Sequence, residues 1–307
     1  MEENTTLKDK CREYQKRRDY HVDADKFIIA HIDGRSFSKM IKNKFQKPFD
    51  RDFINMMNET ASYLCAMVQG VHLAYVQSDE ISLLIKKNTP ESDVFFGGRL
   101  CKMQSIIASL ATAKFNQLMA AKTIQNNMYE ITLMDFEDTE DTVYSPSDCV
   151  DTVLNMSLCQ FDCKVWDVDT ANDAMAWFLF RNIDCIRNSK QQAAQTYLSH
   201  KTLLGLDSDT QIKMLLDEKG VDWNSFSGGE KWGRLIYREK KEKTHTFTNK
   251  NGETVTETYV RNAWGPHDGL DLTVAENRQK LMDICPILKT EQTCQLHPPK
   301  GGCLSKG

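Results

Sequence analysis

The chain has 307 residues, of which 40% are hydrophobic and 27% are charged, and its formal net charge is −4 at pH 7. This is ordinary globular composition, and the length allows one large domain or two small ones. The negative balance excludes a generally basic nucleic-acid coat, so any RNA contact must come from local basic patches. No segment has the apolar length of a membrane span or the character of a signal peptide. The cysteines follow no secreted framework, so we expect reduced thiols, a cytosolic location and no membrane partner.

The N-terminal third of the chain alternates helical and strand patterns. Residues 5–20 are polar and rich in Lys and Arg, which predicts a helix whose basic face is either solvated or in contact with phosphate. Residues 27–32 are apolar and predict a buried strand that ends at Asp33-Gly34. Residues 50–69 predict a helix, with Asp50 as its N-cap and Gly70 as its stop.

A hairpin and a long helix are expected next. Residues 73–77 and 81–85 flank Ser78-Asp79-Glu80 and predict a hairpin with carboxylates at its bend. The order strand, helix, strand, strand is that of the front half of a ferredoxin-like palm, so we expect an α/β (α+β) fold. Residues 99–120 predict a helix on which Lys102 and Ser105 share a face.

The second half of the chain predicts further helices and a C-terminal hairpin. Residues 135–151 are interpreted as an exposed acidic loop. Helices are expected over residues 171–183, 188–204 and 208–218, and strands over 161–166, 235–238, 244–248 and 253–260. An Asn-Gly turn joins the last two strands. We therefore expect a catalytic palm with added helices over residues 1–240 and a hairpin with an irregular tail over residues 241–307.

The carboxylates that follow the apolar strands indicate a divalent-metal site. Mg²⁺ prefers oxygen ligands and is usually bound by one or two carboxylates together with phosphates and water. Asp33 ends one strand and Asp79 lies at the neighbouring bend, while the carbonyl of Gly34 is a further candidate ligand. Strand alternation points the neighbouring Glu80 away from Asp79 unless the bend rotates it, so Glu80 is a ligand only in the second case. The alternative is that both segments are ordinary acidic turns.

Candidate phosphate-binding residues surround these carboxylates. Arg35, Ser36, Phe37 and Ser38 follow Gly34, and their backbone N–H groups would line a phosphate if they opened a helix. Lys47 precedes the first palm helix, in a loop that Pro48 stiffens. For Lys47 the alternative is an ordinary surface lysine, and for Lys102 and Ser105 it is a plain polar helix face.

Several segments resemble the tRNA-His guanylyltransferase family in order and spacing, over roughly residues 8–240. These segments are His31-Ile32-Asp33-Gly34-Arg35-Ser36-Phe37, Phe45-Gln46-Lys47-Pro48-Phe49-Asp50, Tyr75-Val76-Gln77-Ser78-Asp79-Glu80, Lys102-Met103-Gln104-Ser105, Phe161-Asp162-Cys163-Lys164-Val165 and Gly220-Val221-Asp222-Trp223-Asn224. Eukaryotic members carry His-Ile-Asn-Asn where this chain has Ile186-Arg187-Asn188-Ser189. In this respect the chain is more similar to the bacterial and archaeal guanylyltransferase-like branch.

The resemblance implies a palm similar to that of polymerases and nucleotide cyclases. It implies addition of nucleotides to tRNA 5′ ends in the 3′-to-5′ direction, with GTP and ATP as substrates and an assembly of like subunits, such as a tetramer. Asp33, the Gly34 carbonyl and Asp79 would bind a pair of Mg²⁺ ions, with Glu80 as a further acidic catalytic position. The nucleotide would contact residues 33–38, Lys47, Ser78, Asp79, Lys102 and Ser105, and RNA would contact Arg187, Asn188 and Ser189. Both steps of the family reaction, activation of the 5′ end and attack by the incoming 3′-hydroxyl, are phosphoryl displacements.

Two other functions remain open at this stage. A palm-type nucleotide cyclase would use the same carboxylates without RNA. A non-catalytic RNA-binding module would keep only a relic of the metal site. Cys285, Cys294, His297 and Cys303 are candidate ligands of a structural zinc, but their spacing lacks the usual paired form. The Pro- and Gly-rich surroundings instead indicate a loose tail.

Overall fold

The computed structural model describes residues 6–17, 19–37, 44–134, 146–248, 250 and 252–289. The helices are α1 (Leu7–Lys16), α3 (Arg51–Met67), α4 (Leu100–Met134), α5 (Pro146–Leu154), α6 (Ala171–Tyr197), α7 (His200–Leu203), α8 (Ser208–Lys219), α9 (Gly228–Trp232) and α10 (Ala275–Ile284). The strands are β1 (Phe27–Gly34), β2 (Val71–Gln77), β3 (Glu80–Ile85), β4 (Phe161–Val168), β5 (Arg234–Thr248) and β6 (Thr254–Asp268). Short 3₁₀ turns are η1 (Phe95–Gly98), η2 (Trp223–Ser225) and η3 (Pro286–Leu288).

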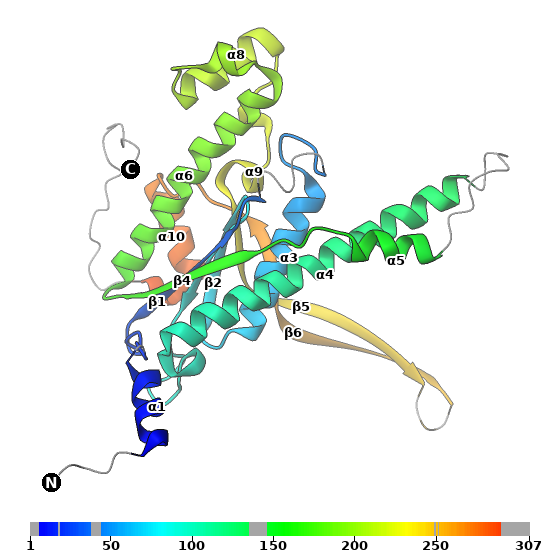
Figure 1. Ribbon diagram of the computed structural model, residues 1–307. Helices are drawn as coiled ribbons and strands as arrows, with labels where there is room; N and C mark the ends of the chain where they lie inside the picture. Colours follow the sequence, from blue (N-terminus) through cyan, green and yellow to red (C-terminus); the bar gives the residue numbers. More distant parts are fainter. Residues whose placement is uncertain are drawn as a thin grey trace.

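One antiparallel sheet organises the molecule, with the strand order β4-β1-β3-β2-β5-β6. Its first four strands and the helices α3 and α4 follow one another as β1-α3-β2-β3-α4-β4. This is the ferredoxin-like arrangement, so the expected palm is confirmed. The hairpin β5–β6 extends the same sheet beyond β2 and then runs away from it as a two-stranded arm (Figure 1).

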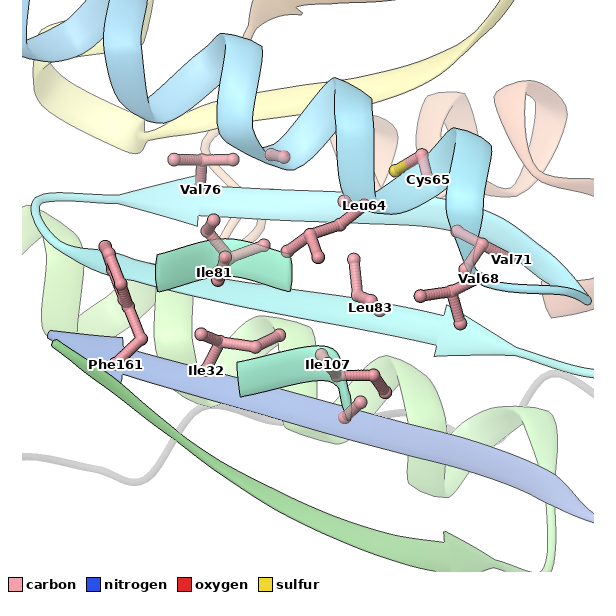
Figure 2. Packing of buried hydrophobic residues seen from close by; sticks show 14 of the residues in the cluster. Ile32, Leu64, Cys65, Val68, Val71, Val76, Ile81, Leu83, Ile107 and Phe161 are labelled. Atoms are coloured by element: carbon pink, nitrogen blue, oxygen red, sulfur yellow. The ribbon is translucent and has the colours of Figure 1, made fainter. Parts of the chain in front are cut away.

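Helices cover both faces of the sheet (Figure 1). On one face, alternate strand residues such as Ile32 and Ile81 pack against α3 and α4, where Leu64 and Ile107 are fully buried (Figure 2). On the other face, the intervening strand residues pack against α6 and α10. Alternation along each strand therefore decides which side chains face α6, and Asp33 is one of them because its neighbour Ile32 faces α4.

The local signals of the first palm elements are confirmed. Asp50 caps α3, since its carboxylate accepts a hydrogen bond from the backbone N–H of Phe53 at 2.9 Å. Gly70 adopts a left-handed conformation, with φ of +83°, just after the helix ends. The hairpin of β2 and β3 has Ser78 and Asp79 at its bend, as expected.

Later elements run longer than expected. The helix expected over residues 99–120 continues to Met134, and the helices expected over 171–183 and 188–204 are wrong in their division, because α6 runs unbroken from Ala171 to Tyr197. Residues 184–187, which lie between these two expected helices, include no Gly or Pro that would end a helix. The strands expected over 235–238 and 244–248 are likewise one strand, because every β5 residue from Arg234 to Thr248 pairs with β6.

Other expectations concern the chain outside the palm core. Within the acidic segment 135–151, residues 135–145 lie outside the described residues, and residues 146–151 are helical as part of α5. The expected boundary between residues 240 and 241 falls within β5, and the division into two parts stays a prediction. Of the zinc candidates, Cys285 is buried, and Cys294, His297 and Cys303 lie outside the described residues. A search of the described helices finds none that is both long and apolar enough to cross a membrane.

We predict that Asn182→Ala lowers the free energy of unfolding by roughly 2–4 kcal/mol, because it leaves several buried backbone groups unpaired. The fully buried Asn182 amide donates to the carbonyl oxygens of Trp232 and Leu270 at 3.0 Å each, and accepts from the Leu272 N–H at 2.9 Å. Urea denaturation measures the change. Asn188→Ala, an exposed asparagine on the same helix, is the matched control, and an equal loss in both variants would contradict the prediction.

Candidate active site

The structure brings the expected metal ligands together at one end of the sheet. Asp33 is the residue before the last of β1 and lies opposite Glu80 on β3. A Cβ atom added to Gly34 would stand 2.8 Å from Oδ2 of Asp79, so the Asp79 carboxylate lies against the Gly34 backbone. Segments that are far apart in the sequence thus place Asp33, Gly34 and Asp79 side by side.

The bend between β2 and β3 determines where its carboxylates point. Ser78 has a φ of 43°, a left-handed conformation that turns the chain between the two strands. Glu80 then begins β3 and faces α6, on the same side of the sheet as Asp33. Its carboxylate accepts a hydrogen bond from Nε2 of Gln77 at 2.7 Å and forms an ion pair with Arg181 of α6. Because Glu80 already has a cationic partner, it is less available than Asp79 as a metal ligand.

The carboxylates also perturb one another electrostatically. Burial raises the pKa of Asp79 to about 6, and the charges of Asp33 and Glu80 contribute to the rise. Burial raises the pKa of Asp33 as well, helped by Glu80 and by Asp162. Asp162 lies opposite Asp33 on β4, so three adjacent strands carry carboxylates in one row. Like charges in such positions are costly unless a cation neutralises them.

This donor set fits a hard divalent cation. Among the described residues no group of three or more His, Cys, Asp or Glu side chains forms a preformed metal site. Asp33 and Asp79, with the Gly34 carbonyl, instead offer a small set of oxygens that a ligand's phosphates would complete. Binding by one or two carboxylates plus phosphates is typical of Mg²⁺ rather than of zinc.

A cavity of about 180 Å³ opens beside Asp79. Its walls come from the loop before α3, the start of α3, the β2–β3 bend, α6, α9 and the first residue of β5. The predicted site residues that line it are Lys47, Ser78, Asp79, Glu80, Asn188 and Ser189. This cavity thus brings together some residues of the metal, nucleotide and RNA predictions, whereas Asp33 and Gly34 are not among its lining residues.

Asp50 holds the loop that presents Lys47 to this cavity. Its Oδ2 accepts a hydrogen bond from the N–H of Gln46 at 2.8 Å, while its Oδ1 caps α3. Phe49 anchors the same loop, with its ring 5.0 Å from that of Phe226. Lys47 itself is exposed, as a residue that reaches into an open cavity would be.

The residues that follow Gly34 are less available for phosphate than expected. The backbone N–H of Arg35 donates to the carbonyl of Gln160 at 2.8 Å, and its guanidinium donates to the Gln160 side chain at 3.2 Å. Phe37 is only 2% exposed and packs against Phe115 and other core rings. Ser36 is exposed, and Ser38 lies outside the described residues.

Lys102 and Ser105 are not brought to the carboxylates. They lie near the start of α4, where Leu100 donates a backbone hydrogen bond to Tyr20, at the end of the sheet where β1 begins. Phe115, further along α4, is the residue that contacts Phe37. At a rise of about 1.5 Å per residue, the distance along the helix from Lys102 to Phe115 is roughly 20 Å.

The segment Arg187-Asn188-Ser189 divides into three different environments. Arg187 is exposed and forms an ion pair with Asp184. Asn188 is exposed at the cavity. Ser189 is buried, where its hydroxyl donates to the carbonyl of Ile186 and accepts a hydrogen bond from Nε1 of Trp223 at 3.3 Å. Ser189 therefore holds α6 against the segment before α9, and Asn188 is the member most available to a ligand.

Sequence reasoning did not assign Arg181, Asp162 or Arg234 to the site. Asp162 could have been found, because it alternates with the apolar residues of its strand and so shares a face with Asp33. No local signal distinguishes Arg181 or Arg234, because their roles depend on contacts with distant elements.

Known proteins of one family are similar to this chain. The family model described as tRNAHis guanylyltransferase matches residues 8–168, just over half of the chain. The chain belongs to the tRNA-His guanylyltransferase family. Members of this family are nucleotidyltransferases that act on tRNA. The chain is 26% identical over 226 residues to the tRNA(His) guanylyltransferase of Debaryomyces hansenii, covering 70% of this chain and 74% of that protein.

Solved structures of similar proteins share the fold. A bacterial tRNA(His) guanylyltransferase-like protein in complex with ATP matches with a TM-score of 0.70 and 25% identity, over 91% of this chain and 99% of that one. The yeast enzyme from Saccharomyces cerevisiae matches with a TM-score of 0.53 and 21% identity, over 72% of this chain and 90% of that one. The better match to the bacterial protein agrees with the branch indicated by Arg187-Asn188-Ser189.

We predict that Asp79→Asn stabilises the metal-free fold at pH 8, by up to about 3 kcal/mol, and by much less at pH 4. The pKa of Asp79 is raised to about 6 in the folded protein, so stability is greatest when Asp79 is protonated and falls as pH rises through that value. Asparagine carries no charge and avoids this loss. Thermal unfolding in EDTA across this pH range, with Asp217→Asn on the exposed face of α8 as control, measures it. A gain in Tm that does not vary with pH would contradict the electrostatic cause.

Proposed function

We propose that this protein adds nucleotides to the 5′ end of tRNA in the 3′-to-5′ direction, using a pair of Mg²⁺ ions held by Asp33, Asp79 and the Gly34 carbonyl. The observation that carries the proposal is the contact of Asp79 with the Gly34 backbone, next to Asp33, beside a cavity that Asp79 lines together with Lys47 and Asn188. GTP and ATP are the proposed substrates, as in the complexes of the bacterial relative. The cytosolic location and the assembly of like subunits stay predictions.

Each part of the site has a defined task in this proposal. Bound Mg²⁺ would neutralise phosphate charge and activate the attacking oxygen. Asp33 and Asp79 would hold this charge close to the Gly34 backbone, against which the Asp79 carboxylate and the Phe37 ring already pack. Lys47 would contact the phosphates from the cavity wall. The ion pair with Arg181 would keep the Glu80 carboxylate in place next to Asp79. Positioning and charge neutralisation are the main requirements of phosphoryl transfer.

The hairpin arm is the proposed RNA contact, together with α1. On β5 the exposed cations are Arg238, Lys240, Lys241 and Lys243. Arg234, the first residue of the same strand, is buried in the sheet and so is not part of this surface. In a chain of net negative charge, a local group of exposed lysines is where a tRNA backbone would bind.

We predict that Asp33→Ala and Asp79→Ala each lower the rate of nucleotide addition by at least about 10³-fold, because each removes a carboxylate proposed to bind Mg²⁺. The assay extends a labelled tRNA that lacks its 5′ nucleotide, with GTP, ATP and Mg²⁺. Asp217→Ala, an exposed carboxylate on α8, is the matched control. Addition that survives either active-site change would refute the assignment.

The same assay separates the alternatives. A nucleotide cyclase would consume triphosphate without tRNA and release a cyclic product. A non-catalytic module would bind tRNA but extend nothing, with or without Asp79. Either result with the wild-type protein would replace the proposed function.

We predict that Lys240→Ala combined with Lys243→Ala weakens tRNA binding and lowers the slope of log K against log salt by about 2, since one phosphate contact is lost for each lysine. Filter binding from 50 to 200 mM salt measures the slope. Lys213→Ala combined with Lys219→Ala on α8 removes the same charge from another exposed surface. Equal slopes for the two double variants would exclude the arm as the contact.

A further inference from the structure

We infer that Arg234 binds a phosphate of a polyphosphate chain in the cavity beside Asp79. This inference rests on the proposed function, and it adds to the nucleotide site a residue that lies outside the segments expected to bind nucleotide. Arg234 is the first residue of β5 and lines the cavity together with Lys47 and Asp79.

The hydrogen bonds of Arg234 leave one end of its guanidinium without a partner. The residue is only 6% exposed. Its Nε donates to Oδ1 of Asn58 on α3 at 3.1 Å, and one terminal nitrogen donates to the carbonyl of Gly229 on α9 at 3.4 Å. The other terminal nitrogen, NH2, is buried and has no hydrogen-bond partner among the described residues. Such a group is costly to bury unpaired, and Arg234 also lines the cavity, so a ligand bound there is the candidate partner of this nitrogen.

No carboxylate within the described residues pairs directly with this guanidinium. The salt bridges of the described chain do not include Arg234. Asp268 and Glu230 are near enough to favour its charged form, but Glu230 is occupied in capping α9 through Ser227. The buried positive charge is therefore not fully neutralised by the protein, and an anion in the cavity would complete it.

Two cations from distant parts of the chain face the same cavity. Lys47 comes from the loop that Asp50 holds, and Arg234 comes from the sheet. The Arg234 guanidinium is fixed by its bonds to Asn58 and Gly229, so little freedom is lost when NH2 takes a phosphate oxygen. Lys47 is free to follow the ligand. A chain of phosphates, with several oxygens along its length, suits this pair better than a single carboxylate does.

The polyphosphate has two possible sources. It belongs either to a free nucleoside triphosphate or to the triphosphorylated 5′ end of an RNA. The chemistry recognised by Arg234 is the same in both cases, so the experiment includes an arm for each source.

The test compares Arg234→Gln with Asn58→Ala by equilibrium binding in Mg²⁺. Arg234→Gln removes the charge and the NH2 donor, whereas Asn58→Ala removes a structural partner of the same guanidinium and keeps both. We expect Arg234→Gln to weaken the binding of ATP and of inorganic tripolyphosphate by about 10- to 100-fold, which is the effect of losing one hydrogen bond to a charged group. Its affinity for adenosine, which has no phosphate, should change by less than about threefold, and Asn58→Ala should bind ATP nearly as the wild type does.

The RNA arm uses one oligonucleotide with either a 5′-triphosphate or a 5′-hydroxyl. A loss confined to the triphosphorylated RNA assigns the phosphate to the RNA end, and a loss for ATP assigns it to the nucleotide. Equal losses for ATP and adenosine, or no loss for any phosphate ligand, overturn the inference. If Arg234→Gln does not fold, Arg234→Lys decides by the same comparison, because it keeps the charge but not the fixed donor. If wild-type protein binds no ATP, the proposed function itself fails. Normal binding of ATP, tripolyphosphate and triphosphorylated RNA by Arg234→Gln in an active enzyme removes only this inference.

Discussion

The pairing of β1 with β3 is the constraint on which the site depends. Asp33 lies opposite Glu80 because Ile28, Ala30 and the residues after them pair in one register with β3. A slip of one residue would move every side chain of β1 to the other face of the sheet. Such a slip would turn Ile28, Ala30 and Ile32 away from α3 and α4, where they are fully buried, and would direct Asp33 into that apolar core. The hydrophobic core therefore fixes the position of the carboxylates proposed to be catalytic.

That register has an electrostatic cost, which the fold offsets only in part. The row Asp162, Asp33 and Glu80 crosses three strands, and Asp79 lies beside it. Arg181 neutralises Glu80, but the pKa values of Asp33 and Asp79 remain raised, so their ionised forms are disfavoured in the absence of a cation. Groups perturbed in this way are typical of functional sites, where binding of the ligand relieves the strain that folding leaves.

The part of the structure that could be predicted is the part set by short-range signals. Asp50, Gly70 and the Ser78-Asp79 bend each act within a few residues of the chain, and each was placed correctly. The pairing of Glu80 with Arg181 and the burial of Arg234 could not be predicted in this way. Arg234 bonds to Asn58, which is 176 residues away, and its sequence neighbours indicate an exposed basic patch. The position of Lys102 near the start of α4, away from the carboxylates, could not be predicted for a related reason, since the face of a helix does not reveal which end of the sheet it covers.

The two halves of β5 explain why Arg234 is buried beside the cavity while the later cations of the same strand are exposed. Its first residues pair with β2, which buries Arg234, Leu235 and Ile236 within the sheet. Beyond them β5 pairs only with β6, and both faces of the ribbon meet solvent, so the following cations are exposed. A single continuous strand thus connects the cavity wall with the proposed RNA-binding arm. Because the β2–β5 hydrogen bonds fix the start of that strand, an RNA held on the arm is also oriented relative to Asp79.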